Sequence, residues 1–255
     1  MGTTVPDMLQ NMTSLTALSI SWCGLVGEFP RGIFNLPNLR VLAAAMNKLN
    51  GTLPEFHSGS RLEVLGFGLT SFCGNIPDSI GRLQSLRYLD LSLSNYSGPL
   101  PPSLGNLTRL TDLELRLNKN LPLLPGKLQK LTSLFFSEMN LVGEIPVSLA
   151  NLTQLYNLVL GGNNIVGKIP SFLMNLTQLN VLDISLNQLH GPIPSSISQL
   201  KNLEYLYLNS NSFTGIVELE IFMSLKNLVS LHLSRNKLTV LTKNITNSTL
   251  PKFNT

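Results

Sequence analysis

One sequence pattern recurs along this chain and limits the folds that it can adopt. The stretches "NLTQLYNLVLGGNNIVGKIP" (151–170) and "NLTQLNVLDISLNQLHGPIP" (175–194) are near copies. Their shared pattern, L-x-x-L-x-L-x-x-N-x-L-x-G-x-I-P, can be followed along the whole chain. Such a period predicts a stack of similar units, each with one anchor leucine. The anchors are Leu18, Leu42, Leu65, Leu89, Leu113, Leu134, Leu158, Leu182, Leu206 and Leu231.

Each position of the pattern has a physical role. The L-x-x-L-x-L part alternates apolar and variable residues, which is typical of a strand with one buried face. The Gly permits a bend, and the Pro stops a helix or a central strand from continuing. One repeat cannot bury its own leucines, so stability has to come from stacking neighbouring repeats.

The Asn of the pattern predicts a ladder of side-chain hydrogen bonds, because its amide both donates to and accepts from backbone groups in a bend. Cys, Thr and Ser can substitute in part, whereas Met139 cannot donate. The interval between anchors is also shorter from Leu113 to Leu134, just before Met139, so we expect irregular structure over 118–139. The ladder column is Cys23, Asn47, Thr70, Ser94, Asn118, Met139, Asn163, Asn187, Asn211 and Asn236.

Composition argues against several function classes. The net charge is +4 and the basic residues are scattered, so nothing indicates a nucleic-acid partner. The sequence has no apolar run long enough for a membrane span, and its start lacks the apolar region of a signal peptide. His57, His190 and His232 do not share a face, so we predict no metal site, no catalytic residues, no cofactor and no enzymatic activity.

The two cysteines, Cys23 and Cys73, lie two repeats apart. Because strands stack at about 4.8 Å, their Cα atoms should be roughly 10 Å apart or more. That separation exceeds the ~7 Å limit for a disulfide, so both thiols are predicted to be free.

The endings "LVGEIP" (141–146), "IVGKIP" (165–170) and "LHGPIP" (189–194) resemble the plant-specific, extracellular class of leucine-rich repeat proteins. The stretch "FTGIVELEIFMSLKNLVSLHLSRNKLTVL" is similar to plant receptor-like proteins, which are cell-surface receptors with a repeat ectodomain, one membrane span and no kinase. The resemblance implies an α/β-type repeat solenoid. This is a right-handed superhelix with a parallel concave β-sheet, about ten repeats of ~24 residues, and a convex side of short 3-10 helices and loops.

We expect a single repeat domain over 1–255 without the family's Cys-rich caps. Residues 1–14 match the back half of a repeat, 15–249 hold ten repeats, and 250–255 resemble the opening of another strand. On this interpretation the chain is an internal piece of a longer ectodomain or a truncated gene product.

The resemblance implies a protein or peptide ligand on the concave face, which the outward residues of the strands line. Repeats four to six place aromatic and charged residues there, the types that dominate interface hot spots. The alternative is a solvated face with incidental aromatics. The candidate residues are Tyr88, Asp90, Asp112, Glu114, Arg116, Phe135, Glu138, Tyr205 and Tyr207.

An apolar stripe follows the first five strands: Trp22, Met46, Leu69, Leu93 and Leu117. It is either a partner surface or a set of side chains that fold over the rim and become half-buried. The sequence favours the second interpretation.

Asn-x-Ser/Thr sequons predict N-glycosylation in an extracellular protein. Alternatively, "NLT" is only a favourable start for the convex segment, through Thr or Asn capping. The sequons are at Asn11, Asn50, Asn95, Asn106, Asn151, Asn175, Asn244 and Asn247.

The favoured hypothesis is a non-catalytic ligand-recognition segment of a plant receptor-like protein in defence signalling, acting with a partner receptor kinase. It would lie on the extracellular side of the plasma membrane as part of a longer protein, attached only through segments missing from this chain. One alternative is a secreted, cell-wall inhibitor of pathogen cell-wall hydrolases that resembles polygalacturonase-inhibiting proteins. Another is a non-functional gene fragment.

Overall fold

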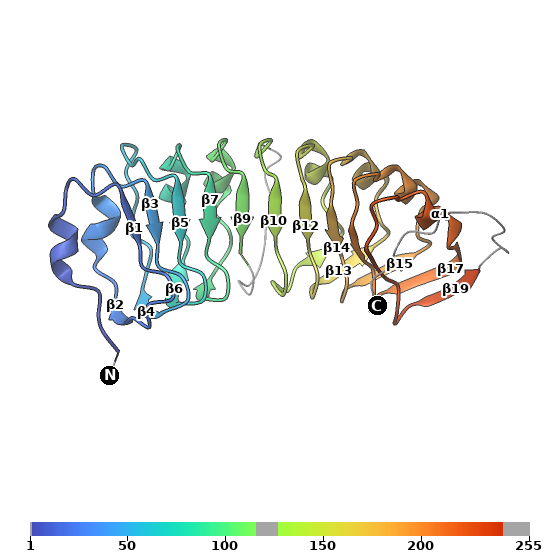
Figure 1. Cartoon of the computed structure of the whole chain (residues 1–255), viewed down its shortest axis with the longest axis horizontal. Helices are drawn as coiled ribbons and strands as arrows, with labels where there is room; N and C mark the ends of the chain where they lie inside the picture. The colour runs from blue at the N-terminus through green and yellow to red at the C-terminus, as the bar shows by residue number, and fades with distance from the viewer. Residues whose placement is uncertain (1, 116–126, 242–255) are drawn as a thin grey trace. The chain divides into compact units, whose positions relative to one another are not determined.

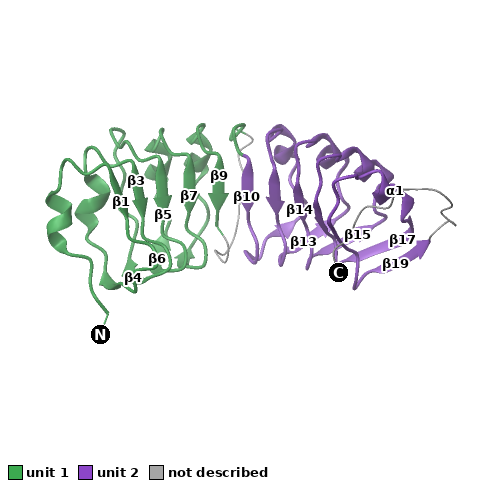
Figure 2. Ribbon diagram, in the orientation of Figure 1, with its two compact units in different colours: residues 1–131 green, residues 132–255 purple. Residues whose placement is uncertain are grey.

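The computed structural model describes residues 2–115 and 127–241. It forms two compact units, residues 1–131 (unit 1) and 132–255 (unit 2), shown in Figure 2. Each unit is built from the same coil, in which a strand, a tight turn, a second short strand and a 3-10 helix follow one another (Figure 1).

In unit 1 the large sheet is parallel, and each strand hydrogen-bonds to the strand of the next repeat (Figure 1). Leu18, Leu42, Leu65, Leu89 and Leu113 lie opposite one another in register, which confirms the predicted anchors. The strands in spatial order are β1 (Ala17–Ser19), β3 (Val41–Ala43), β5 (Val64–Gly66), β7 (Tyr88–Asp90) and β9 (Asp112–Glu114).

Unit 2 repeats this arrangement. Leu134, Leu158, Leu182, Leu206 and Leu231 again lie opposite one another, so the predicted register is also confirmed here. The strands are β10 (Ser133–Phe135), β12 (Asn157–Val159), β14 (Val181–Asp183), β16 (Tyr205–Tyr207) and β18 (Ser230–His232).

The short 3-10 helices that the resemblance implies are present, and each of them begins directly after a proline of the pattern. The proline ring holds φ at a value that suits a helix, and proline lacks a backbone donor, so it fits the residue just before or at the start of a helix. In unit 1 the helices are η1 (Asp7–Asn11), η2 (Arg31–Asn35), η3 (Asp78–Arg82) and η4 (Pro102–Asn106). In unit 2 they are η5 (Val147–Asn151), η6 (Ser171–Asn175) and η7 (Ser195–Gln199), together with one α-helical turn, α1 (Glu220–Met223).

A second set of parallel strands was not predicted. The sequence predicts only a bend at the L-x-G segment, but the segment pairs with its counterpart in the next repeat, and glycines such as Gly167 (φ 91°) accommodate the backbone. Unit 1 contains β2 (Val26–Glu28), β4 (Lys48–Gly51), β6 (Ser71–Asn75) and β8 (Asn95–Ser97). Unit 2 contains β11 (Val142–Gly143), β13 (Asn164–Gly167), β15 (Gln188–Gly191), β17 (Ser212–Glu218) and β19 (Lys237–Leu241).

The predicted ladder is confirmed at the described positions. The Asn163 amide donates to the carbonyls of Phe136 and Leu160, both at 2.8 Å, and its oxygen accepts from the backbone nitrogens of Met139 and Leu141. Thr70 and Ser94 substitute in part, since each hydroxyl donates to the Phe67 carbonyl. Asn118 and the residues up to 126 of the predicted irregular stretch lie outside the described residues.

Candidate functional site

The outward face of the large sheet in unit 1 brings four of the predicted site residues together. Strands β7 and β9 are neighbours, and their register places Tyr88 beside Asp112 and Asp90 beside Glu114. The Tyr88 hydroxyl donates to the Glu114 carboxylate at 3.3 Å. These side chains are half-buried, apart from Asp90, which is almost fully buried. The result is a compact patch of one phenol and three carboxylates, which we call the Tyr88 patch.

Asp90 is held in place by hydrogen bonds within the Tyr88 patch. Its carboxylate accepts hydrogen bonds from the backbone nitrogen of Ser92 at 2.9 Å and from the Ser92 hydroxyl at 2.6 Å. Two residues past the end of the adjacent strand β5 the chain has Gly68, where a Cβ atom would collide with this carboxylate. The missing side chain at Gly68 therefore makes room for Asp90.

The electrostatics of the Tyr88 patch follow from burial and like charge. Burial raises the pKa of Glu114, the negative charges of Asp90 and Asp112 raise it further, and the Tyr88 hydrogen bond opposes the shift. Burial, and then the charge of Asp90, also raise the pKa of Tyr88. Tyr88 therefore remains protonated, and a hydrogen-bond donor, across the physiological pH range. The carboxylates around it make the Tyr88 patch attractive to cations.

Unit 2 presents an aromatic patch on the same face of its own sheet. The rings of Tyr207 and His232 meet edge to face with centroids 4.8 Å apart, and Tyr205 lies 6.4 Å from Tyr207. The repeat spacing places His232 in the same outward column of the sheet as Tyr207. The strand register that stacks β16 on β18 brings it into an aromatic group.

The predicted cluster over repeats four to six is not one described site. Tyr88, Asp90, Asp112 and Glu114 belong to unit 1, whereas Phe135 lies on β10 of unit 2. Arg116 lies outside the described residues. The placement of Glu138 beside the outward strand residues is wrong, because β10 ends at Phe135 and Glu138 lies in the following left-handed turn, at φ 56°.

The apolar stripe occupies that same left-handed turn in unit 1. Trp22, Met46, Leu69 and Leu93 have φ between 53° and 56°, a region that bulky residues rarely adopt and that costs about 1 kcal/mol or more at each site. The expected half-burial is found for Leu93 but is wrong for Trp22, which is 80% exposed. Met46 and Leu69 keep 49% and 44% of their surface exposed, and Leu117 lies outside the described residues.

The thiols behave as predicted in the structure. Cys23 and Cys73 are both free and exposed, and the backbone nitrogen of Cys23 donates to the Asn47 side chain, as expected of a ladder position. Both should therefore alkylate in denaturant without reductant, adding two labels to the intact mass. A disulfide-linked peptide containing both residues would contradict the register of unit 1.

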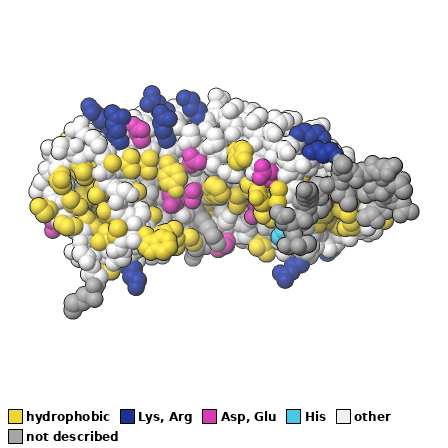
Figure 3. All heavy atoms as spheres, viewed as in Figure 1, with side chains coloured by type: hydrophobic (Ala, Val, Ile, Leu, Met, Phe, Trp, Pro, Cys, Tyr) yellow, Lys and Arg dark blue, Asp and Glu magenta, His cyan; other side chains and the backbone are white. Residues whose placement is uncertain are grey.

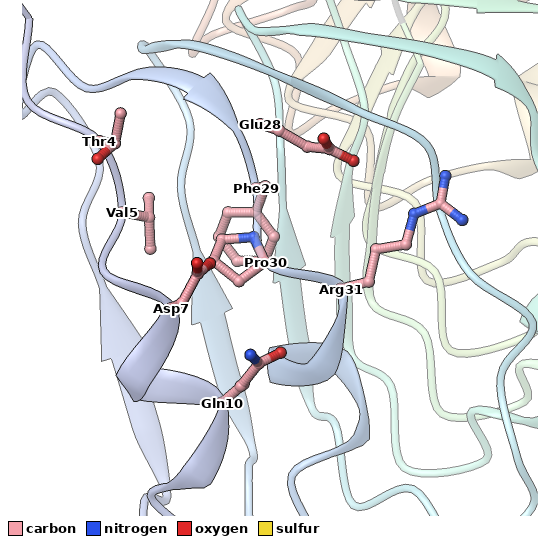
Figure 4. Close-up of a pocket in the computed structure, with 8 residues that line it drawn as sticks. All are labelled: Thr4, Val5, Asp7, Gln10, Glu28, Phe29, Pro30 and Arg31. Carbon is pink, nitrogen blue, oxygen red and sulfur yellow. The ribbon is translucent and has the colours of Figure 1, made fainter.

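An open cavity of about 540 Å³ lies between η1 and η2 (Figure 4). Asp7, Glu28 and Arg31 line it together with apolar residues that include Phe29 and Pro30. No sequence motif indicated this cavity, and it lies beside the helices rather than on the outward face of the large sheet. Within residues 2–115 and 127–241, no three His, Cys, Asp or Glu side chains are grouped to hold a metal ion.

Comparison with known proteins bears on this repeat architecture. Two family models match, one described as "Leucine rich repeat" over residues 153–213 and one as "Leucine Rich Repeat" over residues 85–107. The chain is a leucine-rich repeat protein. Its relatives include Receptor-like protein 6 of Arabidopsis thaliana, 38% identical over 88 residues, and Receptor-like protein 31 of the same plant, 33% identical over 84 residues. The matches cover 34% and 32% of this leucine-rich repeat protein, and 9% and 10% of those relatives.

Solved structures of plant receptors have the same fold as this leucine-rich repeat protein. The TDR receptor aligns with a TM-score of 0.85 and 38% identity, over 93% of this chain and 42% of that one. The peptide hormone receptor RGFR1, solved with RGF2, aligns with a TM-score of 0.83 and 27% identity, over 93% of this chain and 38% of that one. The Arabidopsis receptor kinase HAESA was solved with the peptide hormone IDA and the co-receptor SERK1. It aligns with a TM-score of 0.76 and 29% identity, over 88% of this chain and 42% of that one. The chain thus spans less than half of each.

A search of the described ranges for membrane spans finds no helix of sufficient length and apolar character.

Proposed function

We propose that this leucine-rich repeat protein is the ligand-recognition region of a plant cell-surface receptor-like protein, and that its outward sheet face binds a protein or peptide. We further propose that it serves defence signalling through a partner receptor kinase, on the extracellular side of the plasma membrane. RGFR1 and HAESA, which share the fold, were solved with peptide hormones, and HAESA also with a co-receptor. Those complexes support the class of ligand and the class of partner.

The Tyr88 patch is the observation that carries the proposal. The leucines on the opposite face of the same strands hold the fold, so the outward positions are free to vary. At these positions the chain places a hydrogen-bonded phenol–carboxylate pair, half-buried beside two further carboxylates. Groups held in this way are already partly desolvated and ordered, which reduces the cost of binding a partner. The patch suits a ligand with a cationic group, while Tyr205 and Tyr207 offer aromatic contacts within unit 2.

The test uses leaf cells that express the full-length protein, challenged with a panel of microbial culture filtrates. We expect at least one filtrate to elicit an oxidative burst that depends on the protein. The combined replacement of Tyr88, Glu114, Arg116 and Phe135 by Ala should abolish this burst, because it removes the hydrogen-bonding and aromatic groups of the face. Surface expression should be unchanged, since the anchor leucines remain.

The matched control for this test is Ser195→Ala, an exposed change on η7, which should leave the burst intact. A quadruple variant that still responds normally would contradict the proposed face. A protein that elicits nothing, yet inhibits the polygalacturonase activity of the filtrates, would favour a secreted inhibitor instead.

The proposed extracellular location predicts N-glycans on the described sequons. Asn11, Asn106, Asn151 and Asn175 each end a 3-10 helix, and Asn50 and Asn95 lie on β4 and β8. All six are exposed, and none lies on a strand of the large sheet. Protein secreted from plant cells should therefore lose mass on glycosidase treatment. An unchanged mass would remove the support for the extracellular location. Asn244 and Asn247 lie outside the described residues.

A further inference from the structure

The left-handed turn after each strand carries different side chains in the two units. In unit 1 it holds Trp22, Met46, Leu69 and Leu93, whereas in unit 2 the same turn holds Glu138, Gly162, Leu186, Ser210 and Arg235. The turn itself therefore does not require an apolar residue. Unit 1 has bulky apolar side chains in a backbone conformation that suits Gly or Asn better, and it leaves three of them exposed to water.

Backbone hydrogen bonds align these side chains into one ridge. The backbone N–H of Trp22 donates a hydrogen bond to the carbonyl of Ala45, and the backbone N–H of Met46 donates one to the carbonyl of Gly68. The same bond recurs from Leu69 to Ser92, so successive ridge residues are one strand spacing apart, about 4.8 Å. The ridge is therefore continuous and held by the main chain. Figure 3 shows hydrophobic side chains gathered over the part of this face that unit 1 occupies.

A hollow of about 550 Å³ lies along the ridge. Trp22, Met46 and Leu69 line it together with Val26, Asn47 and Lys48, and the space beside Gly24 is open. In the described part of the chain Lys48 forms no ion pair. The hollow is thus apolar with a single cation beside it, and charge complementarity calls for a carboxylate next to an apolar group.

The size of the ridge selects the kind of occupant. The exposed parts of Trp22, Met46 and Leu69 amount to on the order of 400 Å² of apolar surface, within the range of functional patches. A stable protein–protein interface buries about 800 Å² of polar and apolar surface together on each partner, so a dimer of the chain would need surface well beyond the ridge. The ridge suits a short segment with one or two large apolar side chains.

We infer that the Trp22–Met46–Leu69 ridge and Lys48 form a second binding surface, for a partner polypeptide segment that carries a large apolar side chain beside a carboxylate. This surface differs from the Tyr88 patch, which is acidic and attracts cations. The inference is therefore independent of the proposed ligand site, and the two can fail separately.

Trp22 is the single tryptophan of the chain, so its emission reports on the ridge directly. The probes are three pools of acetylated, amidated octapeptides with a fixed Phe-Leu pair flanked by Glu, Gln or Lys, the other positions being random without Trp or Tyr. With the full chain, the Glu pool should shift Trp22 emission to the blue and protect it from acrylamide quenching. The Gln pool should bind at least fivefold more weakly, and the Lys pool should have no effect. Lys48→Gln should remove the preference for Glu over Gln.

The matched variants separate binding from folding. The double variant Met46→Asn, Leu69→Gly keeps Trp22 and places residues that tolerate the left-handed backbone at both positions. It should weaken Glu-pool binding at least tenfold. Gly is used at position 69 because Asn there would complete an Asn-Thr-Ser sequon. Leu186→Asn changes the same turn in unit 2, where Leu186 is also exposed, and should leave binding unchanged. Tyr88→Ala with Glu114→Gln should leave it unchanged as well.

Three results would overturn the inference. One is that no pool alters Trp22 emission or that all three alter it equally. Another is that the Met46→Asn, Leu69→Gly variant binds like the wild type. The third is that, without peptide, Trp22 emission changes with protein concentration together with dimer formation in sedimentation, which would assign the ridge to a second copy of the chain.

Discussion

Asn163→Ala should destabilise the protein by at least about 3 kcal/mol, because it leaves three backbone groups without a partner at about 1–3 kcal/mol for each buried group. The fourth group, the carbonyl of Leu160, keeps the hydrogen bond that it accepts from Asn187. The side-chain amide nitrogen of Asn163 donates to the carbonyls of Phe136 and Leu160, and its oxygen accepts from the backbone nitrogens of Met139 and Leu141. The side chain is buried, so water cannot easily replace it. Urea unfolding followed by circular dichroism should show a large fall in the midpoint.

Two variants calibrate this effect. Asn164→Ala removes the adjacent, exposed side chain, whose bond to Gln188 is solvent-accessible, and should change stability by less than about 0.5 kcal/mol. Asn163→Asp keeps the accepting oxygen but turns an acceptor toward the carbonyls of Phe136 and Leu160 in a buried site, so it should be at least as destabilising as alanine. Equal midpoints for Asn163→Ala and Asn164→Ala would show that the ladder does not hold the repeats together.

Phe67→Ala should cost about 3–5 kcal/mol, the range for a fully buried aromatic residue, since it removes the centre of an aromatic cluster. The ring of Phe67 has no exposed surface, and its centroid lies 4.5 Å from Phe72, 5.1 Å from Phe29 and 5.3 Å from Phe34. Each lost ring pair adds roughly 0.5–1.5 kcal/mol beyond buried area. Thermal unfolding followed by near-ultraviolet circular dichroism should show a clear loss of stability.

The control for this prediction comes from the next repeat, which has Leu91, also fully buried, at the corresponding position. Phe67→Leu should therefore be tolerated much better than Phe67→Ala, because it keeps most of the volume and leaves a smaller cavity. Equal losses for the two variants would mean that ring contacts, rather than filled volume, dominate this part of the core.

The features that could be predicted from the sequence are those that recur in every repeat. A nearly constant period forces equivalent positions to stack, so the pairing of Leu18 with Leu42 follows from counting alone. The same counting assigns Asn163 to the ladder and separates Cys23 from Cys73. It also places Tyr88 and Glu114 on the outward face, although their hydrogen bond depends on side-chain reach between neighbouring strands.

Features that depend on how single repeats differ were decided only by the tertiary structure. The aromatic cluster draws Phe29 and Phe34 from one repeat and Phe67 and Phe72 from another, so no periodic signal marks it. Glu138 is one such case, because the strand alternation ends at Phe135 and the backbone at Glu138 is left-handed, which the repeat pattern does not reveal.

The apolar ridge also combines a feature that the sequence predicts with one that only the structure reveals. The spacing alone aligned Trp22, Met46 and Leu69 in one stripe. Whether such a side chain is covered or projects into water depends on its neighbours in the adjacent repeats, because Leu93 is half-buried at the same positive φ at which Trp22 is 80% exposed. A pattern of residue types does not encode those neighbours, and the structure leaves Trp22, Met46 and Leu69 exposed where the sequence favours half-burial.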